Sequence, residues 1–383
     1  MHPRECCEKK LFLRESVGPM MGRTMFNFFK KKKPSLPSSP SAASLDGIDL
    51  YLKDIPGAIE RADGEIPRVN WSKVAAAAGP YAEHPAVDLL WTELAAQWLG
   101  VLRRHLDRDD DYRLYEGKHL LMLSADDPQQ VTELLNAGDA AWQRLDELVQ
   151  RTPQERGFGK CAVLVFADQN TYYDYISHYD PDSAETYGAS GGMHISSDGY
   201  LHIVINGVLR SQEGTLVHEL AHEMLSRRDV PAWLNEGLAQ WAASTAGFNQ
   251  GWGGGGPRLD ARQASVVRRY WNWKGIGTFW TGQSFSLASS QRASYQLADV
   301  LFRNLVGHPS RRLRLSEFLA TASQQDAGAA ACQTCFGCPL ASLVEEFLGP
   351  GPWQPATPRA RDRARYVWEA ESNPNDETRI PKQ

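Results

Sequence analysis

A helical pattern dominates residues 46–110, and it is clearest in the segment AVDLLWTELAAQWLGVLRRHL. Apolar side chains recur there three and four residues apart, at Leu89, Leu90, Leu94, Trp98 and Leu102. This spacing places them along one side of an α-helix. The pattern therefore predicts a helical N-terminal subdomain over residues 46–110.

Strand-like and helix-like patterns alternate after this subdomain. The segment YRLYEGKHLLMLSA predicts a strand or a hairpin, and DPQQVTELLNAGDAAWQRLDELVQR has the apolar spacing of a long helix. CAVLVFA, residues 161–167, is a short apolar run that is typical of a buried strand, and TYYDYISHY after it predicts a helix.

Two further short strands are predicted in GGMHIS and YLHIVIN. They are separated by Ser197, Asp198 and Gly199, a turn signal that favours a hairpin. Strands that lead into helices in this way indicate an α+β fold. We expect the main domain to span residues 111–350 and a C-terminal tail to span residues 351–383.

Composition narrows the class of protein. The chain has 383 residues, of which 42% are hydrophobic and 23% charged, as in an ordinary globular protein. The net charge of −5 is small and no basic stripe dominates a folded stretch, so we expect no nucleic-acid partner. No apolar run is long enough for a transmembrane helix and the N-terminus lacks a secretory signal, so we expect a cytoplasmic protein. Nothing in the sequence indicates the oligomeric state.

Residues 1–45 predict a disordered tail. They contain the run Lys30 to Lys33 and the segment PSLPSSPSAAS, which cannot bury enough apolar area to fold. Phe26, Phe28 and Phe29 beside the lysines could touch an anionic membrane surface, although a solvated charge run is the simpler interpretation. Met25 would itself serve as a translation start, which leaves open whether the chain begins at Met1 or there.

The segment LVHELAHEML, residues 216–225, carries the most specific chemical signal. On a helix, His218 and His222 lie on the same face, with Cβ atoms about 5 to 6 Å apart, so both imidazoles could bind one ion. Glu219 lies one position round the helix, where it could meet a metal-bound water and act as a general base. The competing interpretation is an amphipathic helix that contains this order of residues by chance.

A catalytic zinc usually takes three protein ligands and leaves a fourth position for water. The segment VPAWLNEGLAQW supplies a further donor, because Pro231 predicts the start of a second helix and Glu236 falls in its first turns. Glu223 is the rival third ligand, but it projects from the same helix as the histidines at an unfavourable angle. A solvent-facing carboxylate near a helix start is the structural alternative for Glu236.

These residues resemble a known family. HELAH at residues 218–222, followed by WLNEGLA at residues 233–239, is similar to the gluzincins, zinc metallopeptidases with two histidine ligands and one glutamate, and in particular to their peptidase MA-like branch. The resemblance covers roughly residues 157–349 and is sharp only over residues 214–243. It implies a zincin-like domain, a Zn²⁺ ion held by His218, His222 and Glu236, and hydrolysis of peptide bonds with Glu219 as base. Many gluzincins have an acid where this chain has Gln240, whose neutral amide would orient a histidine ligand less strongly.

The resemblance also implies a substrate-binding strand and an oxyanion donor. YLHIVIN corresponds to the edge strand along which an extended substrate would lie. His194 and His202 on this hairpin are expected to be surface or core-edge residues. Tyr295 stands where a catalytic hydroxyl is expected, and packing of its ring into the core is an equal alternative.

Three other features of the sequence have more than one interpretation. The glycine-rich stretch NQGWGGGGPRL could be a lid or an ordinary surface loop. The aromatic side chains Trp271, Trp273, Phe279 and Trp280 are expected chiefly in the core. Cys332, Cys335 and Cys338 lack a clear fourth ligand and are expected to be incidental or redox-sensitive thiols rather than a second metal site.

The sequence thus predicts a zinc-dependent peptidase acting on a peptide or protein substrate. The alternative is a catalytically weak or inactive zincin-fold module that binds a peptide or protein partner. Gln240 favours this alternative, whereas the intact HExxH motif favours the enzyme.

Overall fold

The computed structural model describes residues 45, 47–60, 65–106, 111–179, 191–208, 212–245 and 259–356. The expected tail over residues 1–45, with Phe26 to Lys33, lies outside these ranges apart from Leu45. Most of the glycine-rich stretch and residues 357–383 lie outside them as well.

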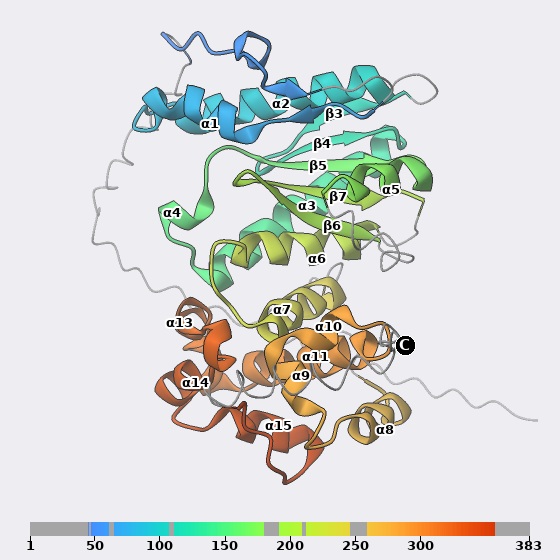
Figure 1. Ribbon diagram of the computed structural model, residues 1–383, viewed down its shortest axis with the longest axis vertical. Coiled ribbons are helices and arrows are strands. Elements are labelled where there is room, and N and C mark those ends of the chain that lie inside the picture. The colour runs from blue at the N-terminus through green and yellow to red at the C-terminus, as the bar shows by residue number, and fades with distance from the viewer. Residues whose placement is uncertain are drawn as a thin grey trace, which may run out of the picture. The chain divides into compact units, whose positions relative to one another are not determined.

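A five-stranded mixed sheet forms the centre of the described fold (Figure 1). Its order is β3-β4-β5-β7-β6, in which β4, β5 and β7 run parallel, while β3 and β6 are antiparallel to their neighbours. The strands are β3 (Arg113–Glu116), β4 (Leu120–Ser124), β5 (Cys161–Phe166), β6 (Gly192–Ser197) and β7 (Tyr200–Asn206). A separate two-stranded pair joins β1 (Ile59–Glu60) to β2 (Arg68–Val69). The expected α+β fold is confirmed.

The central strands are apolar on both faces because helices cover both faces. Every residue of β4 and β5 is buried, and alternate side chains enter two different hydrophobic cores. One core packs against the helices that precede β3 together with α5, and the other packs against α3, α6 and the C-terminal helices. The described residues between 47 and 106 therefore contribute directly to the packing of the main sheet.

Six α-helices lie between residues 71 and 225 among the described residues. They are α1 (Trp71–Ala78), α2 (Val87–Leu106), α3 (Pro128–Val149), α4 (Pro153–Arg156), α5 (Gln169–Ser177) and α6 (Gln212–Leu225). Asp127 caps α3 by accepting from the backbone N–H of Gln129, and Pro128 occupies the first turn, where it needs no hydrogen-bond partner. Leu89 was expected among the buried residues of α2, but it is 41% exposed because it falls just outside the side that faces the core.

The remaining helices follow α6 and lie on the side of it away from the sheet (Figure 1). They are α7 (Ala232–Thr245), α8 (Ala261–Tyr270), α9 (Ile276–Thr281), α10 (Gln283–Ser286), α11 (Gln291–Gly307), α12 (Pro309–Arg312), α13 (Leu315–Thr321), α14 (Ala329–Phe336) and α15 (Leu340–Leu348). Trp271, Phe279 and Trp280 are buried there as expected, but Trp273 is 62% exposed, because it follows the end of α8 in a loop. No described helix combines the length and apolarity needed to cross a membrane.

The predicted hairpin is formed by β6 and β7, with Ser197 paired to Tyr200. Asp198 and Gly199 make the two-residue turn, with φ angles of 50° and 81°, which glycine and aspartate tolerate better than most residues. The assignment of YLHIVIN as the edge strand was wrong. β7 lies between β5 and β6, since its residues are buried and pair on both sides, and β6 is the strand at the edge.

Candidate metal centre

The apolar side of helix α6 packs into a hydrophobic core, so the helix presents both motif histidines to a cleft. Leu216 and Leu220 are fully buried in the core that includes α3 and the sheet. His218 and His222 therefore lie on the remaining side, with side chains 20% and 15% exposed. Their ring centroids are 4.7 Å apart.

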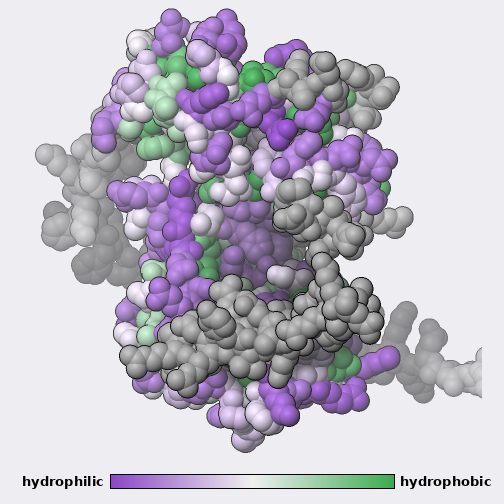
Figure 2. All heavy atoms as spheres, in the orientation of Figure 1, coloured by the Kyte–Doolittle hydropathy of each residue, from purple (hydrophilic) through white to green (hydrophobic). Residues whose placement is uncertain are grey.

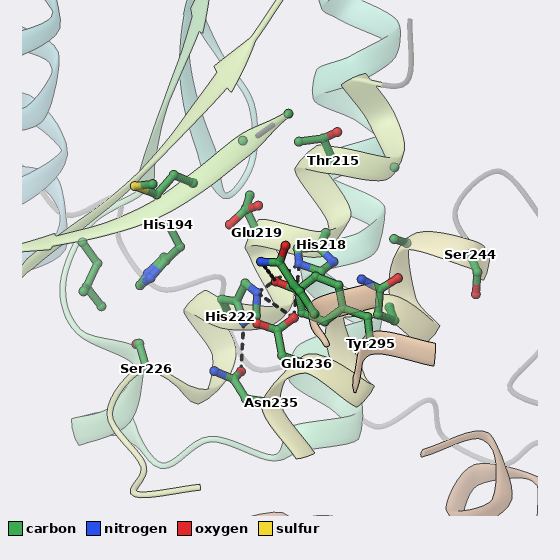
Figure 3. Close-up of a pocket in the computed structure, with 18 of the residues that line it drawn as sticks. His194, Thr215, His218, Glu219, His222, Ser226, Asn235, Glu236, Ser244 and Tyr295 are labelled. Atoms are coloured by element: carbon green, nitrogen blue, oxygen red, sulfur yellow. Dashed lines mark hydrogen bonds and ion pairs between the residues drawn. The ribbon is translucent and has the colours of Figure 1, made fainter. Parts of the chain in front are cut away.

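Helix α7 brings Glu236 to the two imidazoles (Figure 3). The helix begins directly after Pro231, as the sequence predicts. Gly237, next to Glu236, lets α7 approach α11 closely, because a Cβ atom there would lie 2.8 Å from the carbonyl oxygen of Ala298. This close approach also fixes the distance between Glu236 and the residues of α11 that border the cleft.

The three potential ligand atoms form a compact triangle. Nε2 of His218 lies 3.1 Å from Nε2 of His222, and Oε2 of Glu236 lies 3.7 Å and 3.8 Å from these two atoms. Zinc bonds of about 2.0 to 2.2 Å in a tetrahedron would separate ligand atoms by about 3.3 to 3.6 Å. The spacing of these side chains therefore fits a tetrahedral ion. Among the described residues, this is the group of His, Cys, Asp and Glu side chains that could hold a metal.

The protons of the two imidazoles are held on the far side of the triangle. Nδ1 of His222 lies 3.1 Å from Oδ1 of Asn235, and the carbonyl of Ala239 accepts a hydrogen bond from the His218 ring. Carbonyl oxygens only accept, so the Nε2 atoms that face each other carry lone pairs in the neutral rings. Oε2 of Glu236 is buried and has no hydrogen-bond partner among the described groups. With both rings neutral, three acceptor atoms therefore converge, and a bound cation would satisfy all three.

Burial is the largest single influence on the pKa of each candidate ligand. It lowers the pKa of His218 to about 3, with a further contribution from the neighbouring His222. It also raises the pKa of Glu236 above the usual range. For His222, burial would lower the pKa, but the carboxylates of Glu236 and Glu219 outweigh it and the net direction is upward. A neutral His218 is the protonation state that a metal requires of its ligand.

Glu219 lies beside the triangle, between α6 and strand β6 (Figure 3). It is only 6% exposed, and its carboxylate accepts a hydrogen bond from the backbone N–H of His194. Burial raises its pKa, while the nearby imidazoles of His222 and His194 partly oppose this shift. The edge strand thus holds this carboxylate in place next to the candidate ligands.

Tyr295 on α11 reaches the same cleft, and its ring extends toward the triangle (Figure 3). Its hydroxyl accepts a hydrogen bond of 3.4 Å from Nε2 of Gln291. Burial raises the pKa of this hydroxyl, and the carboxylates of Glu236 and Glu219 raise it further. The side chain therefore stays protonated and remains a hydrogen-bond donor next to both carboxylates.

The cleft that contains these residues has a volume of about 990 Å³. Strand β6 forms one wall, α6 and α7 form the floor and the opposite wall, and Tyr295 and Gln291 close one side. Figure 2 shows this face hollowed at mid-height, with hydrophilic residues inside the hollow. An extended chain beside β6 would therefore pass directly over Glu219 and the two histidines.

The structure places the other residues singled out in the sequence away from the triangle. Oε2 of Glu223 points to Nε2 of His194, 2.8 Å away, so Glu223 does not join the histidines of its own helix. His202 is completely buried and bonds to the hydroxyl of Tyr175. Gln240 lines the cleft, but the carbonyl oxygens that meet the histidines come from Asn235 and Ala239.

Asn235 was missed at the level of the sequence, although it directly precedes Glu236 and so shares the same turn of α7. The three cysteines at positions 332, 335 and 338 are free thiols, and Cys332 and Cys335 are buried. They form no cluster of metal-binding geometry within the described part of the chain.

Comparisons of the chain with models of known protein families, with curated proteins and with solved structures find no match.

Proposed function

We propose that this protein is a zinc-dependent peptidase of the gluzincin type, with a zincin-like fold built on the mixed sheet, α6 and α7. The observation that carries the proposal is the convergence of His218, His222 and Glu236, in which a buried carboxylate oxygen has no hydrogen-bond donor among the described residues. The donor set of two imidazoles and one carboxylate is typical of catalytic zinc.

A zinc ion bound there would act as a Lewis acid toward a carbonyl oxygen and would lower the pKa of water toward neutrality. The remaining roles fall to side chains. Glu219, anchored by the N–H of His194, would take a proton from the attacking water and pass it to the leaving amine. Tyr295 would donate its hydroxyl hydrogen to the oxyanion that develops on the attacked carbonyl.

Metal content and hydrolysis test the proposal separately. Purified wild-type protein should contain one zinc per chain and cleave members of a fluorogenic peptide library. Glu236→Ala should lose the zinc, since one of three ligands is removed. Glu219→Gln should keep the zinc and lose hydrolysis by about 10²- to 10⁴-fold, the usual contribution of a general base.

Glu213→Gln is the matched control, because Glu213 is an exposed carboxylate on the same helix and does not line the cleft. Its zinc content and rate should equal those of the wild type. Full hydrolysis by Glu219→Gln would exclude the proposed base, and zinc binding by Glu236→Ala would exclude the proposed ligand set.

The second candidate function is a module that binds a peptide partner without cleaving it. The position of β6 at the edge of the sheet, along the cleft, favours this function, since among the described residues no further strand pairs with β6 and an edge strand can pair with an extended peptide. Stoichiometric zinc and peptide binding, without hydrolysis of any library member by the wild type, would support this module over the enzyme.

A further inference from the structure

A second hollow of about 350 Å³ lies next to the cleft and is rich in aromatic side chains. The residues come from α1, α2, α3, the segment 154–161, the hairpin at residues 198–201, and the end of α6 with the turn after it. The aromatic lining consists of Trp71, Trp91, Trp142, Phe158 and Tyr200.

This hollow and the cleft are neighbours. Leu201 lines both of them. Glu223 lines the second hollow, while its partner His194 lines the cleft, so this hydrogen-bonded pair separates the two spaces. On α6, Glu223 of the hollow directly follows His222, so the hollow begins next to the candidate ligands.

The wall of the hollow is rigid where it meets the core. Trp71 is 1% exposed and stacks on Tyr200 with ring centroids 3.6 Å apart. Trp98 packs edge-on against both of these rings. The aromatic surface is thus formed before any ligand arrives, which reduces the entropic cost of binding.

The rim has exposed groups that are suited to a flat aromatic ring. Phe158 is 49% exposed, although its ring is apolar. The guanidinium of Arg227 lies close to Gly157, and Arg227 forms no ion pair with any residue in the described ranges. A planar guanidinium stacks readily on aromatic faces. Ala75, on the exposed side of α1, also borders the opening.

We propose that this hollow is a specificity pocket for a bulky aromatic side chain of a peptide bound in the adjoining cleft. The inference rests on the proposed binding of a peptide along β6. Aromatic walls favour an aromatic ring over a polar side chain, and the volume is suited to one large side chain rather than a folded segment.

The test uses binding to Glu219→Gln protein, so that turnover does not interfere. The probes are fluorescein-labelled hexapeptides with one tryptophan or phenylalanine at each position in turn, and matched peptides with alanine there. The aromatic peptide of the preferred register should bind about tenfold or more tightly than its alanine match, because a large apolar side chain is buried.

Ala75→Trp, introduced into the same protein, should fill the opening and abolish the aromatic preference. Ala76→Trp is the matched control, since Ala76 is exposed on the same helix but does not border the hollow. It should keep the preference. Equal binding of aromatic and alanine peptides, no binding of either, or an unchanged preference in Ala75→Trp would each overturn the pocket.

These outcomes are separate from the test of catalysis. If binding shows an aromatic preference but the wild type hydrolyses no peptide, the pocket is supported and the proposed peptidase activity is excluded. Hydrolysis by the wild type without aromatic preference would keep the peptidase and reject the pocket.

Discussion

Two histidines in this protein, His202 and His218, have pKa values lowered to about the same level but lie in different surroundings. Burial lowers the pKa of His202 to about 3 and that of His218 to about 3. His202 is on the interior strand β7, and His218 is on α6 at the floor of the cleft. The shifted pKa alone therefore does not distinguish a structural histidine from a candidate ligand.

The neighbours of the two rings make the distinction. His202 is 0% exposed, bonds to the hydroxyl of Tyr175 and is packed between aromatic rings such as that of Trp98. His218 faces a second imidazole and a carboxylate oxygen that lacks a donor, and it opens on a large cleft. A functional site is better recognised here by converging acceptors than by a perturbed pKa.

Replacement of each histidine by phenylalanine gives the sharpest test of this difference. His218→Phe should abolish zinc binding. This effect is larger than the loss of zinc affinity, about 100-fold at most, that is usual when a residue next to a ligand is changed. His202→Phe should retain one zinc per chain, because the His202 ring contacts Tyr175 and other aromatic rings and none of the three candidate ligands. Elemental analysis of both folded variants measures the zinc content. Loss of zinc in His202→Phe would contradict the assignment of His202 as a structural residue.

Tyr295 tests whether the cleft does chemistry. Tyr295→Phe should reduce peptide hydrolysis by about 10²- to 10³-fold, the usual effect of one oxyanion donor, while zinc content stays the same. Tyr270→Phe, at an exposed tyrosine on α8, is the control and should be neutral. An unchanged rate for Tyr295→Phe would assign the ring to packing only.

The pH dependence of stability tests the role of His202. In the unfolded chain His202 is protonated near its ordinary pKa of 6.5, whereas in the folded state its pKa is about 3. Stability therefore falls as the pH drops below 6.5, and His202 should contribute about 2 kcal/mol of the loss between pH 7 and pH 5. Denaturant unfolding at both pH values should show a smaller loss in His202→Phe, and an equal loss would contradict this assignment.

Asn235 should have the smallest effect. Asn235→Ala removes the oxygen that meets Nδ1 of His222, and we expect zinc affinity to fall by roughly tenfold, since the lost partner is a neutral amide. Competition with a fluorescent chelator measures the affinity. Asn170→Ala, at an exposed position of α5, should leave it unchanged. Equal affinities in the two variants would show that Asn235 does not orient the ligand.

Local patterns in the sequence predicted many of the elements correctly. The helix of HExxH, the helix start after Pro231 and the hairpin turned by Asp198 and Gly199 are all formed as expected. Each of these depends on residues close together in the chain, through helical spacing, proline geometry or a positive φ. The preference for Glu236 over Glu223 as the partner of the histidines also followed from such local geometry.

The wrong expectations concern features that depend on distant neighbours. An apolar strand such as YLHIVIN shows that it is buried but not which strands lie beside it, so β7 could not be distinguished from an edge strand. The same limit applies to Leu89 and Trp273, which are apolar yet exposed, because exposure depends on what other segments cover.

The sequence by itself determined the spacing of His218, Glu219 and His222 on one helix, and the start of the next helix before Glu236. Only the tertiary structure decided that the oxygen of Glu236 has no donor, that the N–H of His194 holds Glu219, and that Trp71 and Phe158 share a hollow beside the cleft. Helical spacing is fixed by local backbone geometry, whereas these contacts require the packing of segments that are far apart in the chain.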